Sequence, residues 1–228
     1  MYTMRSVFLF FTLIFFFQAP AQEKINQLDT HGKRHGLWRK TFEENPDQIR
    51  YEGSFHHGKE TGLFTFYILG QEKPAATKFY SPDSDTAQVK FLTQKGKIIS
   101  EGKMLGEERV GEWNYYHLNS DKLMMTENYM DGKLEGEKVI YFENGTPTEK
   151  SFYKNGKLHG EQLIYSEKGV LLKKFTYNEG NLHGPARFYN GKAELLIEGE
   201  YRNDKHYGLW KYYENGNLKE QKDFSAKN

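Results

Sequence analysis

The chain has 228 residues, with 32 lysines and arginines against 31 aspartates and glutamates, and it contains no cysteine. The near-zero net charge argues against a nucleic-acid partner, because neutralising phosphates requires a surplus of basic side chains. The missing cysteines exclude disulfides, thiolate catalysis and thiolate metal ligands.

The N-terminal segment has the pattern of a secretory signal peptide. Arg5 precedes an uncharged apolar run over residues 7–17, and the small residues Ala19 and Ala21 follow it. As a helix this run would rise about 17 Å, whereas the hydrocarbon core of a membrane is about 30 Å thick. We therefore predict a cleaved signal peptide at 1–21 and a mature chain at 22–228 that is exported to the periplasm or secreted, without stable membrane insertion after cleavage.

Glycines recur along the mature chain at intervals of 24 to 26 residues, and one interval holds an alanine in the glycine place. A constant period of this length is the mark of a repeat protein. We take these positions as the anchors of repeat units one to eight, and each anchor is expected to open a strand. The anchors are Gly36, Gly62, Ala87, Gly111, Gly136, Gly160, Gly184 and Gly208.

Large apolar or aromatic residues keep the same register. They stand seven residues before and four residues after most anchors, and tyrosines dominate the position five residues after them. Side chains one residue apart on a strand point to opposite faces, so the last two positions should lie on different faces of a sheet. The tyrosines five residues after an anchor are Tyr67, Tyr116, Tyr141, Tyr165, Tyr189 and Tyr213.

Turn signals occur about twice in each period. Many are Asn-Gly pairs, and Asn203-Asp204 occupies one such place. Such pairs tolerate the positive φ of tight hairpin turns, so consecutive strands of about five to seven residues should be antiparallel. The sequence predicts an all-β fold, an elongated single-layer antiparallel β-hairpin solenoid of about eight repeats and roughly sixteen strands, without helix.

The units resemble MORN repeats. Tyr129-Met-Asp-Gly-Lys-Leu-Glu-Gly136 and Tyr153-Lys-Asn-Gly-Lys-Leu-His-Gly160 are similar to the Y-x-[DN]-G-K-x-x-G core of that family. The variant with Tyr-x-x-Asn-Gly after the second glycine is similar to bacterial MORN-variant proteins of the YwqK antitoxin type. The resemblance implies a protein-binding, toxin-neutralising role, from which the export signal departs.

Motifs for chemistry are sparse. His159 and His183 precede anchors one repeat apart, about 9.6 Å at the usual strand spacing, which is too far for two ligands of one zinc ion. The side chains of His56 and His57 should diverge on an extended backbone. The pairs Glu43-Glu44 and Glu107-Glu108 are expected in hydrophilic turns. We predict no catalytic residues, no bound metal and no cofactor, hence not an enzyme.

The tyrosines five residues after the anchors are the predicted binding surface, because a single-layer sheet has nothing to cover them. The partner is expected to be another protein. A glycan or cell-wall ligand is an alternative, since Gly208-Leu-Trp-Lys-Tyr-Tyr-Glu-Asn-Gly216 is somewhat similar to choline- or glucan-binding repeats. An antitoxin-like role against a partner toxin is the other alternative.

Overall fold

The computed structural model describes residues 24–225, so the predicted signal peptide at 1–21 lies outside the described residues. Within that range the chain is all-β, and no helix there could cross a membrane. The strands are β1 (Gln27–Leu28), β2 (Arg34–Thr41), β3 (Ile49–His56), β4 (Lys59–Phe66), β5 (Ala76–Tyr80), β6 (Thr86–Leu92), β7 (Ile98–Leu105), β8 (Glu108–Tyr116), β9 (Leu123–Met130), β10 (Lys133–Leu134), β11 (Gly136–Tyr141), β12 (Pro147–Lys154), β13 (Lys157–Tyr165), β14 (Leu171–Asn178), β15 (Asn181–Leu182), β16 (Gly184–Tyr189), β17 (Leu195–Arg202), β18 (Lys205–Glu214) and β19 (Asn217–Asp223).

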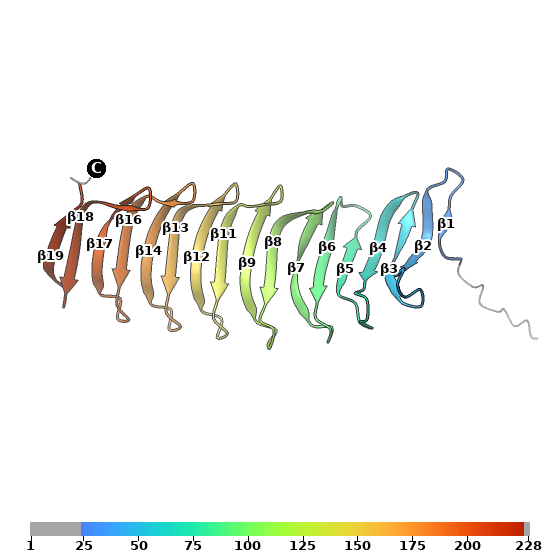
Figure 1. Cartoon of the computed structure of the whole chain (residues 1–228), viewed down its shortest axis with the longest axis horizontal. Coiled ribbons are helices and arrows are strands. Elements are labelled where there is room, and N and C mark those ends of the chain that lie inside the picture. Colours follow the sequence, from blue (N-terminus) through green and yellow to red (C-terminus); the bar gives the residue numbers. More distant parts are fainter. Residues whose placement is uncertain (1–23, 226–228) are drawn as a thin grey trace, which may run out of the picture.

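The strands form one open, elongated sheet in which each strand pairs antiparallel with its neighbour along the chain (Figure 1). Strand β9 pairs with both β10 and β11, and β14 pairs with both β15 and β16. Strands β10 and β11 are therefore two parts of one interrupted strand, and so are β15 and β16. Counted so, the array has sixteen hairpin strands plus the short β1, which confirms the predicted hairpin solenoid.

The anchor glycines explain both the bends and the interruptions. All seven have φ between 65° and 111°, a region that strongly favours glycine. Five of them lie inside β2, β4, β8, β13 and β18 instead of opening a strand, so these strands run eight to ten residues, longer than predicted. At Gly136 and Gly184 the strand breaks and resumes.

Unit three shows what happens without the glycine. Ala87 does not take a positive φ, and β5 pairs with β6 in unbroken register from Ala76 to Tyr80. Regular hairpins instead shift register beside the anchor, as between Glu101 and Lys103 in the β7–β8 pair. Such irregularities increase the local bend of a strand. The alanine therefore straightens this one hairpin.

The most buried side chains stand two residues after the anchors. Trp113 is fully buried, and Trp210 is 2% exposed. Glycine stands nine residues before the anchor in both units, and a Cβ built on Gly102 would lie 2.5 Å from the Trp113 ring. The large indole therefore occupies the space that the glycine leaves, and the interior depends on this exchange of volume. Phe64, Val89 and Ala186 hold the same buried position in other units.

Turns and edges agree with the sequence pattern, with one local difference. Asn155 and Asn203 take positive φ at hairpin turns as expected. In the turn that contains Gly191, however, Ala193 takes the positive φ. The terminal strand β19 is exposed along its whole length, and its charged residues discourage pairing with another edge.

Candidate functional site

The sheet has an inner and an outer face, fixed by the alternation of side chains along each strand. The inner face carries the buried Trp113 and its neighbour Tyr115, whose hydroxyl contacts Arg109. The outer face carries Tyr116, whose hydroxyl reaches Glu101. We call the six predicted tyrosines the outer tyrosine row. All six are half-buried, at equivalent positions in their units: Tyr67, Tyr116, Tyr141, Tyr165, Tyr189 and Tyr213.

Two members of the row are held by carboxylates. Tyr116 donates to Glu101, and Tyr213 donates to Glu198 over 2.9 Å. Burial and the neighbouring Glu101 carboxylate raise the pKa of Tyr116 to about 12, and the Glu198 carboxylate raises the pKa of Tyr213. In return, the Tyr116 hydroxyl lowers the pKa of Glu101. These two phenols are committed within the chain.

The same carboxylates belong to cross-strand ion pairs on the outer face. Lys90 lies 3.3 Å from Glu101, and Lys211 lies 3.5 Å from Glu198. Arg39 pairs with Glu52 in the corresponding place near the N-terminal end. Exposed pairs of this kind contribute little stability individually. They do show that the Glu101 and Glu198 carboxylates are already bonded to groups within the chain.

Tyr141, Tyr165 and Tyr189, the central tyrosines, differ from this arrangement. Ten residues before their anchors stand Thr126, Lys150 and Lys174, so the carboxylate of the other units is missing. Within residues 24–225 their hydroxyls make no side-chain hydrogen bond, unlike those of Tyr116 and Tyr213; the hydroxyl of Tyr67, near the N-terminal end of the row, also makes none. Three consecutive hairpins therefore present half-buried phenols with free hydroxyls, about 9.6 Å apart at the usual strand spacing.

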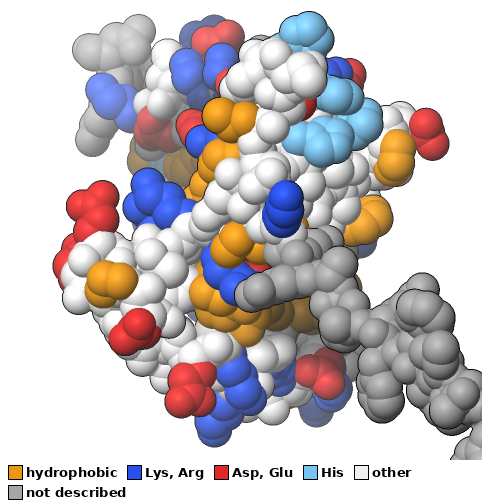
Figure 2. Space-filling model, turned by 90° about the vertical axis from the view of Figure 1, so that its right-hand side faces the viewer, with side chains coloured by type: hydrophobic (Ala, Val, Ile, Leu, Met, Phe, Trp, Pro, Cys, Tyr) orange, Lys and Arg blue, Asp and Glu red, His pale blue; other side chains and the backbone are white. Residues whose placement is uncertain are grey.

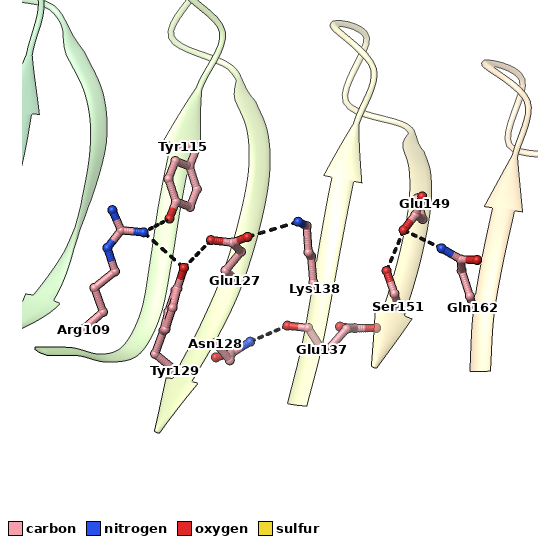
Figure 3. A network of polar contacts seen from close by, with 10 residues as sticks. All are labelled: Arg109, Tyr115, Glu127, Asn128, Tyr129, Glu137, Lys138, Glu149, Ser151 and Gln162. Carbon is pink, nitrogen blue, oxygen red and sulfur yellow. Dashed lines mark hydrogen bonds and ion pairs between the residues drawn. The ribbon is translucent and has the colours of Figure 1, made fainter. Parts of the chain in front are cut away.

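A polar cluster interrupts the aromatic interior in units four to six (Figure 3). Glu127, only 6% exposed, accepts a 2.7 Å hydrogen bond from Tyr129 and lies 3.1 Å from the Lys138 ammonium. Arg109 donates to the hydroxyls of Tyr129 and Tyr115, at 3.1 and 2.6 Å. This cluster was not predicted from the sequence, although Glu127 and Lys138 occupy the places of the glycine and the tryptophan of other units.

Burial and hydrogen bonding act in opposite directions on the ionisable groups of this cluster. Burial alone would raise the pKa of Glu127, but hydrogen bonds from Tyr115, Tyr129 and Lys138 lower it overall. Burial, followed by the contacts to Tyr129 and Glu127, raises the pKa of Tyr115. A second carboxylate, Glu149, accepts hydrogen bonds from Ser151 and Gln162 in the next hairpins. The buried Glu127 is thus paired with Lys138, which is the condition for tolerating a charge in an interior, and the half-buried Glu149 is satisfied by neutral donors.

The histidines are arranged differently from the sequence-based expectation. His57 lies in a turn with a φ of 49°, so the backbone is not extended and its ring lies 4.5 Å from that of His56. His35 joins them from β2, and the three ligand atoms lie within 4.8 Å of one another. His159 and His183 remain on separate hairpins. The carboxylate pairs Glu43-Glu44 and Glu107-Glu108 are exposed, as expected for turns.

Comparisons with known proteins add little beyond the fold. No protein-family model matches the chain, and no curated protein matches it. One similar solved structure is Staphylococcus aureus TarM, a variant in complex with Fondaparinux, alpha-GlcNAc-glycerol and UDP. It is 13% identical and the match covers 50% of this chain but 19% of that one, with a TM-score of 0.25. The fold itself defines the chain as an all-β hairpin-repeat protein.

Proposed function

We propose that this protein is an exported, non-catalytic repeat scaffold of the MORN type that binds another protein through the central tyrosines. The observation that carries the proposal is the contrast within one row. Tyr116 and Tyr213 spend their hydroxyls on Glu101 and Glu198. The three central tyrosines, in the same structural position, leave theirs free for a partner.

Tyrosine suits this role physically. It offers a large apolar ring and a polar tip at a low cost in side-chain entropy, and it is enriched at protein interfaces. The ring of each central tyrosine is half-buried, so little further ordering is needed on binding. A partner segment in the polyproline II conformation advances about 3.1 Å per residue and has three residues per turn. Lying along the array, it would present every third side chain to a tyrosine.

Export is supported by the signal-peptide pattern in residues 1–21, and the MORN assignment by the Y-x-[DN]-G-K-x-x-G core at 129–136 and 153–160. Export is tested by fractionating cells that express the full chain and sequencing the N-terminus of the recovered protein. Recovery from the envelope or medium beginning at Gln22 is the expected result. A cytoplasmic chain that retains Met1 would contradict it.

The binding proposal is tested by replacing Tyr141, Tyr165 and Tyr189 together by serine. Immobilised mature protein should capture a defined partner from the envelope fraction, and the triple variant should lose that partner. A matched control replaces Tyr116 and Tyr213, whose hydroxyls are bonded to Glu101 and Glu198, by serine. The control should retain the partner, and all proteins should keep a β-rich circular dichroism spectrum.

Capture of the same partner by a folded serine variant would refute the proposed surface. Co-sedimentation with purified cell wall or polysaccharide, lost in the same variant, would instead assign the tyrosines to the glycan alternative. Capture of a toxin whose activity this protein neutralises would support the antitoxin alternative.

A further inference from the structure

Three histidines from two parts of the sequence meet at the N-terminal end of the solenoid. His35 lies in β2, His56 ends β3, and His57 follows in the β3–β4 turn. The ring of His35 lies 5.4 Å from that of His56 and 4.8 Å from that of His57. Figure 2, which views this end of the molecule, shows histidine side chains gathered in one group at the surface.

A carboxylate fixes the orientation of one of these rings. The Oδ2 atom of Asp29 lies 2.7 Å from Nδ1 of His57. The other carboxylate oxygen accepts hydrogen bonds from the backbone N–H groups of His31 and Lys33. An ionised carboxylate only accepts hydrogen bonds, so the Nδ1–H group of His57 donates to Oδ2 of Asp29, and Nε2 is the ring nitrogen that can bind a metal ion.

A second ring has an unused polar atom. Nδ1 of His35 is buried and has no hydrogen-bond partner in the described part of the chain. A buried polar atom without a partner costs free energy. The cluster thus combines one imidazole oriented by a carboxylate, one with an unsatisfied nitrogen, and the exposed His56.

We propose that His35, His56 and His57 bind one Zn²⁺ ion, with Asp29 as the positioning residue for His57. Imidazole nitrogens suit Zn²⁺, and three protein ligands with one open position for water form a recognised zinc arrangement. A carboxylate that accepts the second N–H of a ligating histidine is the usual outer partner of such sites.

The structure leaves room for the small adjustment that the ion requires. Zn–N bonds of about 2.0–2.1 Å draw the three nitrogens closer together than their present 4.8 Å limit. His56 and His57 are exposed, so their side chains can rotate towards His35. The ion would link β2, the β3–β4 turn and, through Asp29, the turn after β1. Strand β1 holds the sheet by only two residue pairs, so the site would act as a cap.

Calorimetric titration of ZnCl₂ into the mature chain, freed of metal and of any histidine tag, tests the proposal. One equivalent of Zn²⁺ should bind. His35→Gln, His56→Gln and His57→Gln should each weaken binding by more than the roughly 10–100-fold that loss of an outer partner costs. The matched control is His159→Gln with His183→Gln, which removes two histidines that precede anchors but lie outside the cluster. This variant should bind as the unmodified chain does.

Two further measurements separate a positioned site from surface binding. Asp29→Asn should weaken Zn²⁺ binding about 10–100-fold and shift the ¹⁵N resonance of His57 Nδ1 in the metal-free protein. Zn²⁺ should also slow hydrogen exchange in residues 27–58 and leave β17–β19 unchanged. Absence of saturable Zn²⁺ binding would overturn the proposal, as would binding that is unchanged by His56→Gln and His57→Gln.

Discussion

The exchange of volume between Gly102 and Trp113 gives the sharpest test of how this solenoid is held together. Trp113 is fully buried, and its indole N–H donates to the Lys103 carbonyl over 3.0 Å. In unit six the corresponding positions hold Ser151 and Gln162, which lie opposite each other. The proposed perturbation transplants that pair, as Gly102→Ser, Trp113→Gln and the double variant.

The magnitudes follow from the contacts. A Cβ on Gly102 would lie 2.5 Å from the Trp113 ring, which its hydrogen bond prevents from moving away. Gly102→Ser should therefore cost about 3 kcal/mol, the upper part of the range for overpacking. Trp113→Gln should cost about 3–5 kcal/mol, as loss of a buried tryptophan does. The double variant should recover about 2 kcal/mol relative to the sum, because the two sites share one space.

Urea unfolding followed by circular dichroism measures these differences. A repeat array need not unfold in one step, so hydrogen exchange of β7 and β8 gives the local value. The β17–β18 hairpin, with its own Gly199 and Trp210, serves as the internal reference. Strict additivity of the two single substitutions would refute the volume-exchange explanation, as would a Gly102→Ser variant as stable as the parent.

Three more substitutions test the polar interior and the straight hairpin. Lys138→Ala should destabilise the protein by about 3 kcal/mol, the low end of the cost of stranding a buried charge, because Tyr129 still donates to Glu127; urea midpoints at neutral pH measure this. The lowered pKa of Glu127 means that its contribution to stability is present above the unfolded-state pKa near 4.3 and is lost as the pH falls through the folded-state value. Glu127→Gln should therefore flatten the fall in urea midpoint below about pH 5, and an unchanged acid profile would contradict this assignment. Ala87→Gly should lower the free energy of unfolding by about 0.5–1 kcal/mol, because no positive φ is needed there, and thermal unfolding measures this as a lower melting temperature. A gain in stability would show that the hairpin is strained.

The overall fold was predictable because its signals are local and repeated. Positive φ at the anchor glycines and at Asn155 follows from the residue types themselves. The position of the anchors inside the strands was not predicted, because a glycine that ends a strand and one that bends it have the same sequence signal. The register shift beside Gly111 is set by pairing with β7, which the period alone does not show.

The candidate sites were predictable only in part. The outer tyrosine row was identified from its period, but which hydroxyls are bonded depends on contacts with the facing strand, such as the one from Tyr116 to Glu101. The histidine cluster was missed because its geometry depends on the positive φ of His57 and on His35, which is 22 residues away in the chain. The interior cluster around Glu127 was missed because the buried position two residues after the anchor was not recognised as the core.

Variation among the units separates positions that hold the fold from positions that are free to change. Units two, four and eight share a Glu-Gly pair before the anchor and a large, buried aromatic residue after it. In units four and eight the glutamate accepts a hydrogen bond from the tyrosine of the outer row. Units five to seven lack this Glu-Gly pair, and residues that are not aromatic stand two positions after their anchors. These central units keep their hairpins through ion pairs and smaller side chains, such as Glu127 with Lys138. Their tyrosines are not needed to satisfy a carboxylate, so a partner can engage them without breaking any internal bond. The units with Glu-Gly are Glu52-Gly53, Glu101-Gly102 and Glu198-Gly199.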